Sequence, residues 1–284
     1  MIRLQTPVTD TECTVGISFS NKIMMIGSCF SDNIGTMLKN YGFDVCVNPF
    51  GTLYNPASIC QSIRRLINCD KFTSQDCVEI GAGDCRICSF SHHTSFARAD
   101  KDEFLNNANQ RLEEASAFFK SCNKVIITLG TVWCYRHIER DIIVSNCLKR
   151  HPNEFIREMM DVAEVKKYLS EVAELCPDKE FIFTVSPIRH FKDGAHGNQL
   201  SKSTLLLGIN EYLKDGKGDY FHAYEIVMDE LRDYRFYAED MCHPTQQTAN
   251  YICERFLDWA LPLQEHGTLK ENIRAWKHGC HIVK

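Results

Sequence analysis

The sequence predicts an α/β protein with a mainly parallel sheet that is covered by helices on both faces. Lys124–Leu129 and Glu180–Val185 are short apolar runs, and their continuous hydrophobicity is typical of strands buried on both sides. Longer segments with helical periodicity lie between such runs, as in chains that alternate strand and helix. Two segments with alternating hydrophobicity and central turn residues, Cys77–Phe90 and Trp133–Cys147, predict β-hairpins inserted at the sheet edge.

The remaining elements follow from local signals in chain order. Ser31 is the predicted N-cap of the first helix, and Pro56 stands at the first turn of the second. The other predicted strands are Lys22–Gly27 and Phe43–Val47. The predicted helices are Asp32–Asn40, Pro56–Ile67, Lys101–Lys120, Asn153–Leu175, Leu200–Leu213, Ala223–Leu231 and Thr245–Leu261.

Length and composition place the chain among ordinary globular proteins. It has 284 residues, of which 44% are hydrophobic and 24% charged, so disordered, collagen-like and coiled-coil classes are excluded. We find no repeat or linker and expect one domain, residues 1–284, with a possible carboxy-terminal extension after about residue 262. The net charge of −5 argues against nucleic acid as a partner.

The cysteines and the amino terminus bear on the compartment. There are 15 cysteines, an odd number, and many lie in apolar stretches where they act as small hydrophobic residues. Residues 1–7 lack the charged and apolar regions of a signal peptide. We therefore expect a cytoplasmic protein with free thiols, and no apolar run is long enough for a membrane span.

Polar and small residues follow each strong strand of the predicted sheet. Ligands of open parallel sheets bind at the carboxyl ends of the strands, so these segments should meet at one edge. They are Gly27–Ser31, Asn48–Pro56, Gly130–Trp133 and Ser186–His190.

Ser28 is the candidate nucleophile because it lies on a strand-to-helix turn after Gly27. Its hydroxyl could point from the edge of the sheet, and its backbone N–H would lie at a helix amino terminus, where negative charge is favoured. The alternative is that Ser28 only turns the chain or caps the helix. The G-x-S-x-G motif of α/β-hydrolases is absent.

A serine nucleophile needs a base and a group that orients the base. An aspartate three residues before a histidine could supply both, and this spacing occurs three times, at Asp193/His196, Asp219/His222 and Asp240/His243. Spacing alone does not choose among them. Asp240/His243 is favoured because Pro244 and a helical pattern follow it, which predicts a loop that presents His243 just before a helix.

Other residues support rival readings. Cys85 and Cys88 with His92 and His93 suggest zinc, but residues three apart in a strand face opposite sides, so we expect no metal. Cys29 lies beside Ser28 and Cys242 lies beside His243, so a cysteine could be the nucleophile instead.

Four residues are candidate substrate contacts. Arg189 and His190 could hold an anionic or polyhydroxyl substrate. His92 and His93 could reach the same edge, unless one of them is a core histidine. Phosphate-binding glycine loops are absent.

The sequence resembles the GSCFA family. Its motif occurs here as Gly27-Ser28-Cys29-Phe30, with Ser31 in place of the final alanine, and the likeness continues in order as far as Pro244. The other blocks that carry it are Asn48–Pro56, Ser91–His93, Thr128–Thr131, Thr184–His190 and Asp240–Pro244.

That family is similar to the SGNH (GDSL-like) hydrolases, which implies a three-layer α/β/α sandwich. The resemblance implies Ser28 as nucleophile, His243 as base and Asp240 as the residue that orients it. The wider group takes oxyanion donors from the serine, a glycine and an asparagine in a Gly-x-Asn segment. Here Gly51 fits the glycine, but Gly130-Thr131-Val132 has no asparagine, so Asn55 or the Thr131 N–H is expected to serve.

We therefore expect a serine acyl-ester hydrolase without a cofactor. Its substrate would be a small acyl ester or an acylated carbohydrate, since the wider group often removes acetyl groups from sugars. An O-acyltransferase and a non-catalytic carbohydrate or metabolite binder on the same scaffold are the alternatives. The sequence does not indicate an oligomeric state.

Overall fold

The computed structural model describes residues 5–9 and 11–282. Its centre is a parallel sheet in the order β10-β9-β5-β1-β2. The strands are β1 (Lys22–Gly27), β2 (Asp44–Val47), β5 (Lys124–Leu129), β9 (Glu180–Val185) and β10 (Asp219–Phe221). β10 was not predicted, because its three residues are too short to give a periodic signal.

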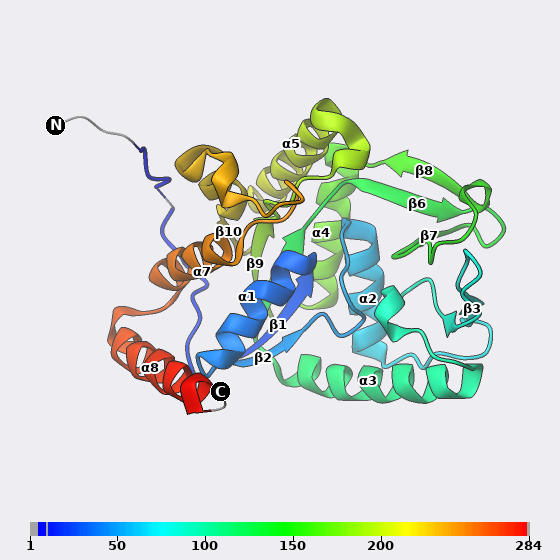
Figure 1. Ribbon diagram of the computed structural model, residues 1–284, viewed down its shortest axis with the longest axis horizontal. Helices are drawn as coiled ribbons and strands as arrows, with labels where there is room; N and C mark the ends of the chain where they lie inside the picture. Colours follow the sequence, from blue (N-terminus) through cyan, green and yellow to red (C-terminus); the bar gives the residue numbers. More distant parts are fainter. Residues whose placement is uncertain (1–4, 10, 283–284) are drawn as a thin grey trace.

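Helices cover both faces of this sheet, as predicted (Figure 1). The side chains of β1 alternate: Met24 and Ile26 join the core under one set of helices, and Ile23 and Met25 join the core on the other face. The first core is shared with α2 (Pro56–Asn68), α3 (Lys101–Ser121), α4 (Val162–Leu175) and α5 (Gly194–Leu213), and the second with α1 (Cys29–Asn40) and α7 (Gln246–Ala260). The three-layer α/β/α sandwich is therefore confirmed.

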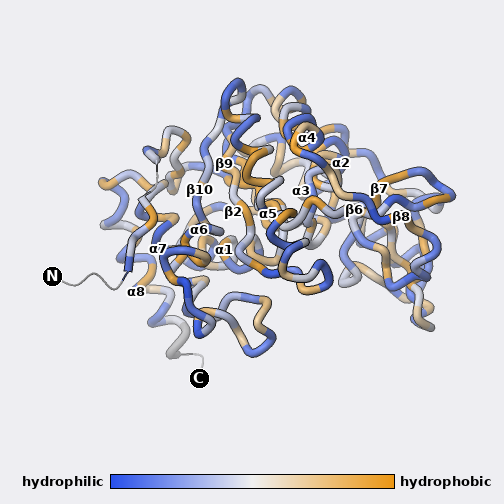
Figure 2. The backbone as a smooth tube through the Cα atoms, turned by 90° about the horizontal axis from the view of Figure 1, so that it is seen from above, coloured by the Kyte–Doolittle hydropathy of each residue, from blue (hydrophilic) through white to orange (hydrophobic). Residues whose placement is uncertain are grey.

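The predicted hairpins form, but as separate small sheets. β3 (Val78–Glu79) pairs antiparallel with β4 (Ile87–Cys88). β6 (Trp133–His137) pairs with β7 (Ile142–Val144) on one side and β8 (Phe155–Met159) on the other. Neither sheet is hydrogen-bonded to the edge strands β2 or β10, and β6–β8 lie across the molecule from the two termini (Figures 1 and 2).

Several predicted helix boundaries were wrong. The segment expected as one helix over Asn153–Leu175 begins as β8, and α4 starts only at Val162, where Asp161 forms a capping box with Glu164. Strand pairing with β6 overrides the local helical pattern. α5 begins at Gly194 rather than Leu200, and Ala223–Leu231 is a short α6 (Ala223–Glu225) that continues as a π-helix.

The residues after Pro262 fold back onto the sandwich. They form α8 (His266–Ile282), which packs against the end of α1. Asn272 donates a hydrogen bond to the Tyr41 carbonyl at 2.9 Å, and the Trp276 and Tyr41 rings meet edge to face at 5.8 Å.

Three expectations concern compartment and thiols. The 14 cysteines whose side chains the structure describes are all free. Within that part, no helix has the length and apolar character needed to cross a bilayer. Residues 1–4, on which the signal-peptide argument partly rests, lie outside the described residues.

The end of β1 requires a glycine. Gly27 has φ +152°, and a Cβ there would lie 2.2 Å from the Thr128 carbonyl oxygen of β5. A backbone atom cannot yield as a flexible side chain can, so both the dihedral and the contact oppose any side chain.

We expect Gly27→Ala to lower the free energy of unfolding by at least about 2 kcal/mol. The control is Gly267→Ala in α8, where a Cβ would meet nothing within 4 Å and helix propensity favours alanine. Urea unfolding of both variants measures the difference. Equal stability of the two would contradict the close approach of β1 to β5.

Candidate functional site

The loops after β1, β2, β5 and β9 meet at the carboxyl edge of the sheet, as expected for parallel strands. They enclose a cavity of about 410 Å³, which we call the rim cleft. Its lining combines residues from these loops, the loop before α7 and the β6–β8 sheet. The lining residues used below are Cys29, Tyr54, Asn55, Thr131, Trp133, Arg157, His190, Lys192, Asp193, Cys242 and His243.

Ser28 occupies the turn between β1 and α1. Its backbone is extended, and its hydroxyl oxygen accepts a hydrogen bond from the Phe30 N–H at 3.3 Å. Ser28 is thus the N-cap of α1, and the prediction of Ser31 in that role was wrong. The residue is 1% exposed, and Cys29 beside it lines the cleft.

Asn48 holds this turn in place. Its Oδ1 accepts from the Gly27 N–H at 2.8 Å, and its Nδ2 donates to Asp32 Oδ1 at 2.7 Å. Asn48 has φ +42°, a conformation that asparagine tolerates better than most residues. One amide therefore ties the end of β1 to the first turn of α1.

Asp240 and His243 form a hydrogen-bonded pair. Asp240 Oδ2 lies 2.6 Å from His243 Nδ1, and Asp240 Oδ1 accepts from the N–H groups of Cys242 and His243, both at 2.9 Å. These bonds, first the one from the His243 N–H, lower the pKa of Asp240 to about 2. An ionised Asp240 holds the Nδ1–H tautomer of a neutral His243 and leaves Nε2 as an acceptor.

The other two aspartates with this spacing are engaged elsewhere. Asp193 is paired with Arg157. Asp219 accepts hydrogen bonds from the N–H groups of Thr14 at 2.7 Å and Val15 at 2.6 Å, which tie the amino-terminal segment to β10. Of the three pairs, only Asp240 and His243 have both side chains hydrogen-bonded to each other among the bonds of the described residues.

The structure does not join Ser28 to His243 directly. Among the hydrogen bonds of residues 5–9 and 11–282, none connects the Ser28 hydroxyl with the imidazole, and Ser28 itself is not in the lining of the rim cleft. What the fold brings together is His243 and Cys29, the neighbour of Ser28, at the same cavity.

Most of the predicted oxyanion donors are already used. The N–H of Gly51 donates to Asn48 O at 2.8 Å, that of Thr131 to Tyr54 O at 3.0 Å, and that of Ser28 to Thr128 O at 3.2 Å. These N–H groups are bonded to carbonyls of β5 and of the loop after β2. The expectation that Gly51 and Thr131 are free to bind an oxyanion was therefore wrong.

Asn55 is the exception. Its Oδ1 caps α2 by accepting from the Ser58 N–H at 2.9 Å, so Nδ2 is the part of the amide that can bind another group. Asn55 lines the rim cleft, and its Nδ2 has no partner among the described residues.

The two adjacent histidines do not line the cleft, contrary to expectation. His92 is 0% exposed and packs against Phe72 and Phe96, with ring centroids 4.5 Å apart in each case. Its Nδ1 is bonded to Ser89 Oγ at 2.7 Å, and burial lowers its pKa to about 3. His92 is therefore a core histidine. His93 covers Gly51, where a Cβ would lie 2.4 Å from that of His93, and accepts from the Ser95 N–H.

The other two candidate substrate contacts, His190 and Arg189, line different cavities. His190 lines the rim cleft beside Tyr54, and burial lowers its pKa to about 4, so it is neutral at pH 7. Arg189 lies on the other side of the same segment, in a second pocket.

Sequence reasoning named His190 but missed Trp133 and Arg157 among the polar groups at the cleft. Trp133 Nε1, Arg157 Nε and His190 Nε2 are buried at its wall without a hydrogen-bond partner in the described structure. A buried polar atom without a partner costs about 1–3 kcal/mol, so such groups mark a place where a ligand can supply the missing bonds. No local pattern singled out Trp133 or Arg157, since β8 itself was not predicted.

Lys202 was also missed. It is 0% exposed, and its Nζ donates to the carbonyls of Gly130 at 2.6 Å and Ser186 at 2.8 Å. Burial lowers its pKa to about 7. The available signal was a lysine three residues before Leu205 and seven before Ile209, on an apolar helix face.

The zinc reading gains no geometric support. Cys85 lies in the loop before β4 and is exposed, whereas Cys88 lies in β4 and is buried. In the part of the chain that the structure describes, no group of three histidine, cysteine or acidic side chains is placed to hold a metal ion.

Comparison with solved structures finds weak similarity at low sequence identity. An acetyl xylan esterase from the rumen bacterium Butyrivibrio proteoclasticus is 13% identical, with 86% of this chain and 64% of that chain covered and a TM-score of 0.43. A family two carbohydrate esterase from Clostridium thermocellum, solved with cellohexaose, is 15% identical, with 85% and 64% covered and a TM-score of 0.40. The chain thus spans less than two thirds of the length of either protein.

Sequence comparison identifies the family. Among curated proteins, none matches this chain. The model of the GSCFA family matches residues 22–256, a span that runs from β1 into α7 and includes Ser28, Asp240 and His243. The chain belongs to the GSCFA family.

Proposed function

We propose that this protein is a serine-dependent acyl-ester hydrolase with Ser28, His243 and Asp240 as its catalytic triad. The observation that carries the proposal is the Asp240–His243 pair, at 2.6 Å, at a cavity that also receives the amino end of α1. This is the arrangement in which an aspartate orients a histidine base toward a nucleophile.

In the proposed reaction, the Ser28 hydroxyl turns from the Phe30 N–H toward His243 and attacks the ester carbonyl. His243 Nε2 takes the serine proton, and Asp240 stabilises the imidazolium. His243 then gives the proton to the departing alcohol, and a water molecule, activated by the same histidine, releases the acyl group from Ser28. The amino end of α1 and the Asn55 amide favour the transient oxyanion.

The chemistry of the cysteines supports serine over a thiol as nucleophile. Burial, followed by the charge of Asp32, raises the pKa of Cys29 to about 11. Burial and then Asp240 raise the pKa of Cys242. Both groups are therefore neutral thiols at pH 7, whereas nucleophilic cysteines need a lowered pKa.

One observation favours a second candidate function, a carbohydrate or metabolite binder without activity. The N–H groups of Ser28, Gly51 and Thr131 are all bonded within the chain, so Asn55 is the one predicted oxyanion donor that is not already used. Loss of one oxyanion donor costs about a hundredfold or more in rate. An O-acyltransferase would use the same triad with an alcohol in place of water.

We expect Ser28→Ala and His243→Ala each to reduce hydrolysis of p-nitrophenyl acetate by about a thousandfold or more, and to abolish labelling by a fluorophosphonate probe. Matched controls are Ser31→Ala, a buried hydroxyl on the same helix, and His196→Ala, an exposed histidine with the same Asp-x-x-His spacing. The controls should retain turnover. Equal turnover by wild type and Ser28→Ala would exclude Ser28 as nucleophile.

The raised thiol pKa values predict slow alkylation of Cys29 and Cys242 by iodoacetamide at pH 7, faster as pH rises because the thiolate fraction grows. Exposed Cys85 should react first, as peptide mass spectrometry would show. Cys29→Ser should lose less than about tenfold in turnover. Selective alkylation of Cys29 at pH 7, with loss of activity, would favour the cysteine mechanism instead.

If the protein is a binder, calorimetry should detect binding of O-acetylated glucose. The same protein should neither hydrolyse p-nitrophenyl acetate nor react with the fluorophosphonate. A hydrolase should instead release acetate from the same compound. Release that stops in Asp240→Ala would reject the binder.

A further inference from the structure

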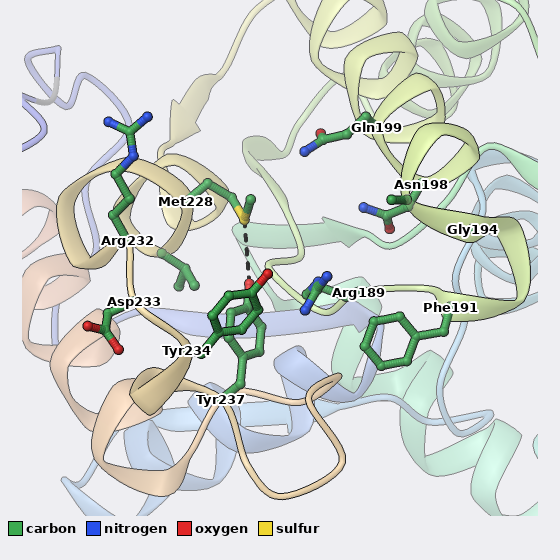
Figure 3. A pocket seen from close by; sticks show the side chains of 12 residues that line it. Arg189, Phe191, Gly194, Asn198, Gln199, Met228, Arg232, Asp233, Tyr234 and Tyr237 are labelled. Carbon is green, nitrogen blue, oxygen red and sulfur yellow. Dashed lines mark hydrogen bonds between the residues drawn. The ribbon is translucent and has the colours of Figure 1, made fainter.

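A second cavity of about 420 Å³ lies beside the rim cleft. We call it the aromatic pocket, because Phe191, Tyr234 and Tyr237 surround Arg189 in it (Figure 3). Its volume is within the range of small-molecule sites, about 300–1,000 Å³. Nothing in the proposed triad chemistry uses it.

One stretch of chain separates the two cavities. His190, Lys192 and Asp193 line the rim cleft, whereas Arg189, Phe191 and Gly194 line the aromatic pocket. The Arg189 N–H donates to Cys242 O at 3.1 Å, so this wall is joined to the loop that carries His243. A ligand in the aromatic pocket would thus contact the wall to which the loop of His243 is bonded.

Two of the aromatic residues of this pocket are largely exposed to solvent. Phe191 is 51% and Tyr234 67% exposed. Large aromatic side chains that remain in water beside a cavity mark binding surfaces, and their faces suit the apolar C–H side of a sugar ring. The size and these rings together indicate a ligand of about one sugar unit.

The polar groups that face this pocket are mainly donors. The Arg189 guanidinium lies 4.8 Å from the Phe191 ring and 5.5 Å from the Tyr237 ring. In the described structure its one hydrogen bond runs from Nη1 to Met241 O, at 3.2 Å, which leaves Nε and Nη2 available. Those two nitrogens can bind two oxygens of an anion side by side.

Asn198 adds a donor whose orientation is fixed. It is 8% exposed, and its Oδ1 accepts from the His190 N–H at 3.0 Å. Because a backbone N–H can only donate, the oxygen must face it, and Nδ2 must face the pocket. Gln199 is held similarly by the Tyr224 hydroxyl at 2.7 Å, and Figure 3 shows both amides at the pocket beside Arg189.

The acidic side chain at the pocket is neutralised by its own neighbour. Asp233 pairs with Arg235 at 3.2 Å and accepts from the Arg235 N–H at 2.8 Å. Arg232, at the mouth, pairs with Asp229 at 3.4 Å. The charge that remains unpaired is that of Arg189, so an acceptor-rich, negatively charged group is the complement of this pocket.

We propose that the aromatic pocket binds a sugar-sized ligand that carries an anionic oxygen group, with Arg189 and Asn198 as the anion contacts. The aromatic pocket shares no lining residue with the rim cleft, so this is a separate ligand site and the proposal goes beyond the proposed function. The anion itself can be a carboxylate or a phosphate, since both present the same paired oxygens.

The test is direct binding, which does not require catalysis. Calorimetry with wild type should give glucuronate or glucose 6-phosphate an affinity at least about tenfold higher than that of neutral glucose. Whichever of the two binds more tightly shows whether the natural ligand carries a carboxylate or a phosphate. Equal affinity for all three sugars, or binding of none, would overturn the proposal.

Two variants assign the contacts. Asn198→Asp keeps the acceptor for the His190 N–H but turns a negative oxygen toward the pocket, so it should abolish the preference for the anion. Arg189→Lys keeps the charge but loses the paired donors, and should reduce the preference several-fold. Arg86→Gln, which removes an exposed arginine on the β3–β4 hairpin, is the charge control and should leave the preference intact.

Thermal melting checks that each variant is folded. An unchanged preference in folded Asn198→Asp would remove Asn198 as a contact and overturn the pocket assignment. Turnover of p-nitrophenyl acetate is measured on the same proteins. If the protein hydrolyses p-nitrophenyl acetate but shows no preference for the anion, the aromatic-pocket proposal is rejected and the hydrolase proposal is kept. If it prefers the anion but shows no hydrolysis, the hydrolase proposal is rejected and the aromatic-pocket proposal is kept.

Discussion

The parallel hydrogen-bonded register of β1, β5 and β9 is the constraint on which the candidate site depends. Gly27, Thr128 and Thr184 lie in register across these strands, so each strand delivers its following loop to the same edge. Residues about 100 positions apart thereby come into one cavity without any direct attraction between them. A shift of one residue in this register would exchange the two core faces and move every loop.

Buried polar contacts hold this edge together where the strand ladder ends. Asn48 ties the end of β1 to α1, and the Lys202 ammonium joins the carbonyls that follow β5 and β9. A buried cation is costly unless strong acceptors surround it. Two carbonyl oxygens at 2.6 and 2.8 Å from Nζ, together with the lowered pKa, account for the complete burial of this lysine.

The same wall serves both cavities. Residues in the segment after Ile188 project alternately to one side and the other, and the loop of His243 is bonded to it through Cys242. The bond from the Arg189 N–H to the Cys242 carbonyl therefore fixes the wall of the aromatic pocket relative to the loop that carries His243.

The sequence by itself determined the α/β class, four of the five central strands and the order of the edge loops, because continuous apolar runs and turn residues are local signals. It also singled out Asp240 and His243, whose pairing depends on a three-residue loop. Only the tertiary structure decided that β8 is a strand, that His92 is in the core and that Arg189 and His190 face different cavities. Those outcomes depend on which surfaces the packed elements leave open, a property that no local window contains. The oxyanion donors depend on tertiary structure in the same way, since the N–H groups of Ser28 and Thr131 find their acceptors on β5 and on the loop after β2.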